Sequence, residues 1–513
     1  MKRSLSLLLA ATILLTAHCS VLAQDLDFIL RGGSLIDGSG SPAIHADIGI
    51  AGDRIVFVGS GGGRKAKREI DATGLVVTPG FIDPHTHTAG DLSDAKRSHN
   101  EAYLMQGVST VATGNDGDSP TAIGSTLAKW SQQGIGTNAA LFIGQGTVRR
   151  EVMGMSDAKP TAEQLDRMKA LVGTAMAEGA IGISTGLYYA PGSFSSTEEV
   201  IELARISAQH GGMYDTHMRD ESSYSIGLLA SVAETIRIGQ EAHSPVMISH
   251  IKALGADVWG KSTEIIALID NARKAGVQVT ASQYPYTASG TSVTAALVPR
   301  WAEAGGALLR NLDDSSLHAR LISEMNQNLA RRGGADSLLM TASRDQAIVG
   351  KTLARVARER NEAPVDAAIE IVKAGGSDVA SFNMKESDIE LFMRQPWVMT
   401  CSDGSEGHPR KYGTYPRKLR QYVYDKHVLS LEAAVRSSTS LPAETLGLKN
   451  RGLLKPGYFA DVLAFDPKTF NERATYQSPR ALSTGVRYLT VNGQLAIDQG
   501  SLTKALAGRA LKH

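Results

Sequence analysis

The sequence carries almost no net charge, since 53 lysines and arginines are balanced by 52 aspartates and glutamates, leaving +1. Nucleic acids and anionic membranes are bound through a surplus of basic residues, so this balance argues against a partner of either kind. Internal repeats and low-complexity tracts are also lacking. With 42% hydrophobic and 20% charged residues, the chain has the composition of an ordinary globular protein with a large core.

A hydrophobic run long enough to span a membrane is lacking too. The apolar run at residues 5–15 is short for a span, follows two basic residues, and precedes small side chains that end at Ala23. This pattern predicts a secretory signal peptide over residues 1–23. A lipoprotein signal is disfavoured because His18, not a small residue, precedes Cys19. We therefore expect an exported protein, periplasmic or secreted, without a membrane anchor after cleavage.

Cysteine is scarce. The chain has two, and cleavage after Ala23 would leave Cys401 alone. A single thiol cannot form an internal disulfide, so the exported protein must draw its stability from its core.

Both ends of the chain have strand patterns. Alternating residues with glycine and aspartate punctuation recur at residues 28–33, 46–50 and 54–59, and again at 460–466 and 486–493. Together they predict one small β-sandwich domain, built from residues 24–78 and 448–513.

The middle, residues 79–447, alternates strand and helix signals, which indicates parallel βαβ units. Eight strand candidates end near His87, Asn115, Gly144, Thr185, His217, His250, Tyr284 and Asp403. They predict an α/β fold, a (β/α)8 TIM-like barrel whose functional residues follow the strands at one face. The last gap is too long for one unit, so we expect an inserted subdomain, about residues 291–343, that could cap the site.

Two histidines end the first predicted barrel strand. His85 and His87 are separated by one residue, and strand alternation puts both on one side, where they can bind one ion. By itself such a pair also fits two ordinary polar residues at a strand-to-loop junction.

Other predicted strands end in metal-ligand residue types as well. In a barrel, six side chains would converge on one mouth: His85, His87, Asp116, His217, His250 and Asp403. One histidine alone would be read as a hydrogen-bonded residue near the core, but six convergent ligand types favour a metal site. Imidazole and carboxylate without thiolate suit zinc, with manganese, cobalt or iron as alternatives. A catalytic metal lowers the pKa of its water to roughly 7, and Asp403 is placed to act as general base and then acid.

The segment from Pro79 through His87 resembles the signature of the amidohydrolase superfamily. Further segments are similar to the D-aminoacylase (N-acyl-D-amino-acid deacylase) family: residues 179–187, 214–221, 249–252, 284–289, 402–404, 408–417 and 451–461. The resemblance implies a barrel with a composite β-sandwich. It also implies hydrolysis of N-acyl-D-amino acids to a carboxylate and a free D-amino acid, with one or two Zn²⁺ ions.

Two positions depart from that family. D-aminoacylases typically have cysteine where Asp116 stands; a carboxylate is a harder ligand that can bridge two ions, although Asp116 also suits a simple turn before Gly117. The family often has histidine at Gln145. Residues 180–189 hold no lysine, which disfavours the hydantoinase branch and its carboxylated lysine.

Substrate contacts are predicted from residues near the strand ends. Lys252 and Tyr284 could bind the acyl carbonyl or stabilise an oxyanion, and Arg410 or Arg417 could clamp the α-carboxylate. Each also has a structural reading, because an exposed arginine is usually solvated and a tyrosine beside proline often packs.

Other functions stay open at this point. An exported metallo-dipeptidase or an amidohydrolase of other stereospecificity would use the same ligands, and a non-catalytic metal- or solute-binding protein is a further alternative. A serine hydrolase is disfavoured, because Pro191-Gly192 forms a turn where a nucleophile elbow needs a helix. The sequence leaves the substrate side chain, the acyl group, the D or L selectivity and the oligomeric state open.

Overall fold

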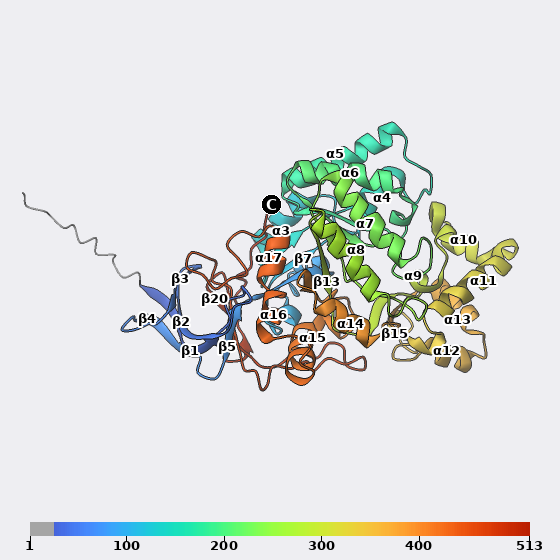
Figure 1. Ribbon diagram of the computed structural model, residues 1–513. Coiled ribbons are helices and arrows are strands. Elements are labelled where there is room, and N and C mark those ends of the chain that lie inside the picture. Colours follow the sequence, from blue (N-terminus) through green and yellow to red (C-terminus); the bar gives the residue numbers. More distant parts are fainter. Residues whose placement is uncertain (1–24) are drawn as a thin grey trace, which may run out of the picture.

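A computed structural model describes residues 25–513, so the predicted signal peptide lies outside the described residues. Three parts follow one another across the molecule in Figure 1: a β-sheet formed by the chain ends, a central barrel, and a helical insert on the far side. Within residues 25–513, no helix is long and apolar enough to cross a membrane.

The barrel has the eight predicted parallel strands. Their order around the ring is β6 (Phe81–Thr86), β7 (Val108–Thr113), β8 (Asn138–Leu141) continuing into β9 (Ile143–Gly144), β10 (Gly182–Gly186), β11 (Met213–His217), β12 (Val246–Ile248), β13 (Val279–Gln283) and β17 (Val398–Thr400). The backbone N–H of Asp403 donates to the carbonyl of His85 at 3.0 Å, which brings the chain after β17 against β6. The predicted α/β barrel is confirmed.

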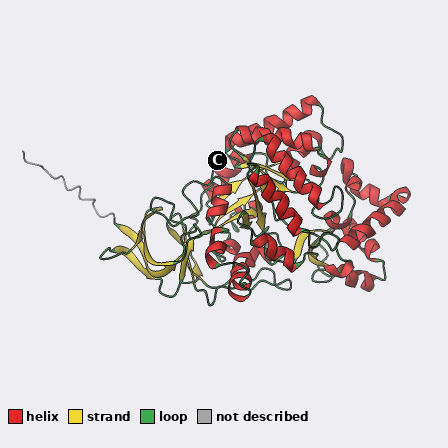
Figure 2. Cartoon of the chain, viewed as in Figure 1, coloured by secondary structure: helices red, strands yellow, loops and turns green. Residues whose placement is uncertain are grey.

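Helices surround these strands on the outside, as Figure 2 shows. The main ones are α3 (Ile123–Gln133), α4 (Gln145–Met153), α5 (Ala162–Glu178), α6 (Thr197–Gln209), α7 (Leu228–Ala242), α8 (Ser262–Lys274) and α14 (Glu386–Met393). Local sequence fixes their starts: Thr161 and Gln164 form a capping box on α5, and the Ser196 side chain accepts from the Glu199 N–H on α6. The last barrel unit ends in shorter helices, α15 (Arg410–Arg417), α16 (Leu431–Arg436) and α17 (Ser440–Thr445). Two one-turn helices, α1 (Ala89–Leu92) and α2 (Glu101–Leu104), follow β6.

The two chain ends, predicted to form one β-sandwich together, pair in a single nine-stranded sheet. Its order is β21-β20-β19-β18-β5-β1-β2-β3, with β4 also paired to β1. The N-terminal strands are β1 (Leu26–Leu35), β2 (Ile44–Ala51), β3 (Arg54–Gly59), β4 (Ala66–Asp71) and β5 (Val76–Pro79); the C-terminal ones are β18 (Val462–Phe465), β19 (Val486–Val491), β20 (Gln494–Asp498) and β21 (Ser501–Leu502). The antiparallel pairing of β5 with β18 joins the two halves.

The insert is a small unit of its own, longer than the predicted residues 291–343. Its sheet has the order β14-β16-β15, from β14 (Ala288–Ser292), β15 (Leu338–Ser343) and β16 (Ser377–Phe382). Its helices are α9 (Val293–Leu297), α10 (Leu308–Asp313), α11 (Ser315–Arg331), α12 (Leu353–Arg360) and α13 (Pro364–Lys373), which pack around a separate hydrophobic core. The unit extends to Phe382 because its central strand, β16, comes last in the chain.

Candidate metal centre and active site

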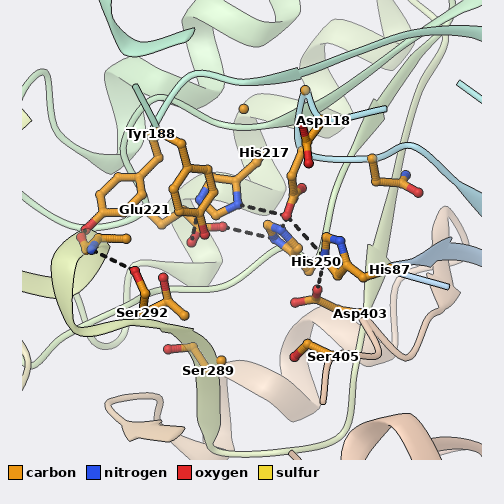
Figure 3. A pocket seen from close by; sticks show the side chains of 18 of the residues that line it. His87, Asp118, Tyr188, His217, Glu221, His250, Ser289, Ser292, Asp403 and Ser405 are labelled. Atoms are coloured by element: carbon orange, nitrogen blue, oxygen red, sulfur yellow. Dashed lines mark hydrogen bonds and ion pairs between the residues drawn. The ribbon is translucent and has the colours of Figure 1, made fainter. Parts of the chain in front are cut away.

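A cavity of about 360 Å³ opens where the barrel strands end. Its wall combines residues after the barrel strands with residues of the insert, so the insert covers one side of the barrel mouth. In the close-up of Figure 3, His87, His217 and His250 turn their rings toward a common region next to Asp403.

The structure brings together all six predicted metal-ligand residues. Asp116 lies among the four imidazoles: its Oδ1 is 3.5 Å from His85 Nε2 and 3.3 Å from His250 Nε2. Its Oδ2 is 3.5 Å from His87 Nε2 and 3.7 Å from His217 Nδ1. Asp403 Oδ1 lies 3.0 Å from His87 Nε2 and 3.5 Å from His85 Nε2.

Several ligand atoms in this cluster have no hydrogen-bond partner although they are buried. They are His85 Nε2, His217 Nδ1 and Asp116 Oδ1. Buried polar atoms are rarely left unpaired, and here they belong to residue types that bind divalent cations. The donor set therefore fits a metal ion, and the two carboxylates with four imidazoles supply enough ligands for two.

The backbone is strained at this cluster. Asp116, His250 and Asp403 have positive φ angles of 57°, 37° and 48°, in the left-handed region that residues with a side chain rarely adopt. Such strain persists where the surrounding structure imposes it, often at functional sites. Asp116 thus forms the turn predicted from its position before Gly117, and its carboxylate also lies in the cluster.

A buried polar network holds the ring of His85. Its Nδ1 lies 2.8 Å from Ser249 Oγ, and Ser249 in turn donates to Asp215. Asp215 also accepts from Ser184 Oγ at 2.6 Å and from Asn115 Nδ2 at 2.9 Å. Fixing Nδ1 in this way turns Nε2 toward Asp116 and Asp403, which is how histidine ligands are commonly oriented.

Glu221 is a site residue that the sequence did not single out. It lies four residues after His217, with Oε2 3.5 Å from His217 Nε2 and Oε1 3.2 Å from His250 Nδ1. Its Oε1 also accepts from Lys252 Nζ at 2.6 Å. Burial opposes ionisation of Glu221, but Lys252 and the two imidazoles outweigh it and lower the pKa of this carboxyl. The only sequence signal for Glu221 was its place in the family-like segment 214–221.

The predicted substrate residues Lys252 and Tyr284 both line the cavity. Lys252 is not free, because its Nζ also lies 2.7 Å from His250 Nδ1 in addition to its ion pair with Glu221. The hydroxyl of Tyr284 is buried and has no hydrogen-bond partner among the described residues.

The two arginines predicted to bind substrate lie in different places. Arg410 lines the cavity, and its Nη1 lies 2.8 Å from Asp403 Oδ2. Arg417 does not reach it: its Nε donates to the Pro285 carbonyl at 2.7 Å and its Nη1 pairs with Glu472 at 2.5 Å. Of the two arginines predicted to clamp the α-carboxylate, the structure places only Arg410 in the cavity wall. The two residues begin and end α15, which separates them by about 10 Å of helix.

Asp403 is held as a carboxylate. Burial alone would raise its pKa, but the Arg410 guanidinium and the neighbouring imidazoles lower the pKa well below its usual range. Gln145 takes no part in the cavity wall; its side chain donates to Ser195 Oγ at 2.7 Å behind it.

Comparison with known proteins identifies the family of this chain. The Amidohydrolase family matches residues 68–497. The chain belongs to the amidohydrolase family. This amidohydrolase is 36% identical to the D-aminoacylase of Alcaligenes xylosoxydans xylosoxydans over 516 residues, which cover 95% of the chain and 98% of the relative.

Two solved structures resemble this amidohydrolase closely. A D-aminoacylase crystal structure matches with a TM-score of 0.83 and 34% identity, over 95% of this chain and 100% of the other. The N-acyl-D-glutamate deacylase of Bordetella bronchiseptica, solved with zinc and a phosphonate inhibitor, has the same TM-score at 30% identity, with the same coverage. The predicted resemblance to D-aminoacylases and the predicted enzyme class are confirmed.

Proposed function

We propose that this amidohydrolase cleaves the amide bond of N-acyl-D-amino acids, releasing a carboxylate and a free D-amino acid, with Zn²⁺ as its metal. The convergence of His85, His87, Asp116, His217, His250 and Asp403 on one point of the barrel mouth carries this proposal. The names of the similar proteins, D-aminoacylase and N-acyl-D-glutamate deacylase, support the substrate class.

The Asp116 carboxylate faces all four imidazoles, with Oδ1 near His85 and His250 and Oδ2 near His87 and His217. Together with Asp403, these residues would hold one or two ions. A bound Zn²⁺ acts as a Lewis acid that polarises the amide carbonyl and acidifies water. A carboxylate here is a harder ligand than the cysteine typical of D-aminoacylases, so this chain suits harder ions as well.

Asp403 is the proposed proton carrier. Its low pKa keeps it ionised at neutral pH, so it can take a proton from the attacking water and return it to the leaving amine. Arg410, 2.8 Å away, fixes the orientation of the carboxylate.

Substrate binding falls to residues beside Asp403. The unpaired hydroxyl of Tyr284 can donate to the oxygen that becomes negative as the carbonyl is attacked, a contact worth roughly 3 kcal/mol. Arg410 stacks over the Tyr284 ring at 4.6 Å, which places a positive charge for the substrate α-carboxylate next to the reacting bond. Lys252 completes this positive side of the cavity.

The test is amine release by the mature chain, supplied with zinc, from matched N-acetyl-D- and N-acetyl-L-amino acids. Release confined to the D series supports the proposal. Equal or L-biased release would leave a metallo-amidohydrolase of other stereospecificity, and release from dipeptides alone would indicate a dipeptidase.

We also propose that the protein is exported, on the signal-peptide pattern of residues 1–23. Cell fractionation with N-terminal sequencing of the mature chain tests this. A mature chain that begins at Gln24 in the periplasm or medium is expected, and a cytoplasmic chain that retains Met1 contradicts it.

A further inference from the structure

The basic residues that line the active-site cavity are not equivalent. They are Arg150, Lys252, Arg332 and Arg410. Three have a carboxylate partner: Asp118 for Arg150, Glu221 for Lys252 and Asp403 for Arg410. Among residues 25–513, no carboxylate lies within 4.0 Å of the fourth, Arg332.

Arg332 is buried where the insert meets the barrel. It follows α11 of the insert and is 2% exposed. Its Nε donates to the Tyr224 hydroxyl at 2.8 Å, and its Nη2 donates to the Tyr188 hydroxyl at 3.1 Å. Its remaining nitrogen, Nη1, is buried without any hydrogen-bond partner.

This arrangement leaves a positive charge without compensation. An arginine stays protonated at any physiological pH, and a buried charge is normally paired. Two neutral hydroxyls orient the guanidinium but cannot neutralise it. A purely structural role, in which the two tyrosines tie the insert to the barrel, accounts for Nε and Nη2. It leaves unexplained why Nη1 is buried without a partner in a residue that lines the cavity.

Tyr188 connects Arg332 to the metal-ligand residue His217. The ring of Tyr188 stacks on His217 with centroids 5.6 Å apart, and Arg332 binds the hydroxyl at the tip of that ring. In Figure 3, Tyr188 lies on the other side of His217 from Asp403. Arg410, next to Asp403, is therefore close enough to the scissile bond for an α-carboxylate, whereas Arg332 is placed for a group at the end of the substrate.

We propose that Arg332, held by Tyr188 and Tyr224, determines specificity by binding a carboxylate at the end of the substrate side chain, as in N-acyl-D-glutamate. This proposal rests on the proposed function of the same cavity. A guanidinium binds a carboxylate through two parallel hydrogen bonds, and an incoming carboxylate supplies the missing negative charge. A terminal carboxylate could also belong to a dicarboxylic acyl group, such as succinyl, and the experiment separates the two sources.

The experiment compares kcat/KM for N-acetyl-D-glutamate and N-acetyl-D-glutamine, which differ in charge but hardly in shape. We expect the wild-type kcat/KM to be higher for N-acetyl-D-glutamate on the order of 100-fold, because the neutral amide of N-acetyl-D-glutamine leaves the buried Arg332 charge without a partner. In Arg332→Met, the kcat/KM values for the two substrates should differ by no more than about threefold, because the value for N-acetyl-D-glutamate falls and that for N-acetyl-D-glutamine is kept. Arg332→Lys, which keeps a positive charge, should restore part of the preference for glutamate.

The control is Arg331→Met. Arg331 is the neighbouring residue of α11, contacts Ser223 and Asn328, and does not line this cavity. It should leave the preference unchanged. Thermal melting of each variant shows that it is folded before rates are compared.

Several outcomes would overturn the subsite. One is equal wild-type rates for the two substrates; another is an Arg332→Met variant that loses both rates in parallel, as expected of a structural residue. Arg332-dependent hydrolysis of N-succinyl-D-leucine without a preference for glutamate would assign the residue to the acyl group instead. Hydrolysis of N-acetyl-D-leucine without a glutamate preference overturns the subsite alone, whereas no hydrolysis of any D-substrate overturns the proposed function with it.

Discussion

The metal centre and the wall around Arg332 border the same cavity but come from different parts of the chain. The metal centre uses residues that follow barrel strands, where the fold repeats the same position eight times. Arg332 comes from the insert, which has its own sheet and core and no counterpart in the barrel repeat. Changes in the first region should therefore affect turnover, and changes in the second should affect the choice of substrate.

Asp403→Asn should have the largest effect on turnover. Asparagine keeps the shape but cannot carry the proton, so kcat should fall by about 10²–10⁴-fold. Metal content, measured separately, shows whether the loss comes from chemistry or from a missing ligand. A variant that keeps most of its activity would break the assignment of turnover to this region.

Asp116→Asn tests the metal centre directly. Removing the charge that faces four imidazoles should weaken zinc binding by about 10–100-fold or more, as measured by titration against a competing chelator. Asp118→Asn is the matched control, since Asp118 lines the same cavity two residues later but is largely exposed and contacts Arg150 and Thr147, neither of which is a metal-ligand residue. Equal affinities in the two variants would contradict a bridging role for Asp116.

Arg410→Met and Arg417→Met form a matched pair from the two ends of α15. Arg410→Met should lower kcat/KM by about 100-fold, because it removes both a partner of Asp403 and a substrate contact. Arg417→Met should leave kcat/KM within about threefold and cost stability only, by about 1 kcal/mol, through its lost contacts with Glu472 and Pro285. Both predictions are checked by measuring kcat/KM and thermal melting of the two variants. A large drop in kcat/KM for Arg417→Met would support a role for Arg417 in substrate binding.

Lys418→Met should have the smallest functional effect and a distinctive pH dependence. Burial lowers the pKa of Lys418 to about 7, with its Nζ donating only to the Thr400 and Ser437 hydroxyls. Between pH 7 and 10.5 the unfolded lysine binds a proton that the folded one does not, so wild-type stability rises with pH through that window.

Methionine removes this dependence. The variant should be more stable than wild type by about 1–3 kcal/mol near pH 7, an advantage that fades toward pH 10. Denaturant unfolding across this range measures it. A stability difference that is constant with pH would show that Lys418 stays charged in the fold.

Most of the barrel and its metal-ligand residues could be predicted from the sequence. Alternation along a strand shows which side chains share one side, and in a (β/α)8 barrel the functional residues follow the strands at one face. His85 and His87 are linked by alternation, and His217, His250 and Asp403 each follow an apolar strand. Asp116 was predictable although it replaces the expected cysteine, because its position after β7 does not depend on residue type.

The remaining site residues have no such periodic signal. Glu221 reaches the cluster through the chain after His217, which has no regular structure. Arg332 lines the cavity from the insert, a separate unit. Arg417 was predicted together with Arg410 because both follow Asp403 in the sequence, whereas the helix α15 that separates them was not visible there. The predicted insert, residues 291–343, is too short because the central strand of its sheet, β16, follows two further helices, α12 and α13.

The sheet formed by the two chain ends cannot form fully until the C-terminal strands have been synthesised. Val76–Pro79 has one neighbour in β1, made early, and another in β18, made after the whole barrel. Until the last part of the chain is available, β5 presents an unpaired edge that the early strands cannot satisfy. Finishing the fold therefore requires contacts between residues that are very far apart in sequence, which slows folding.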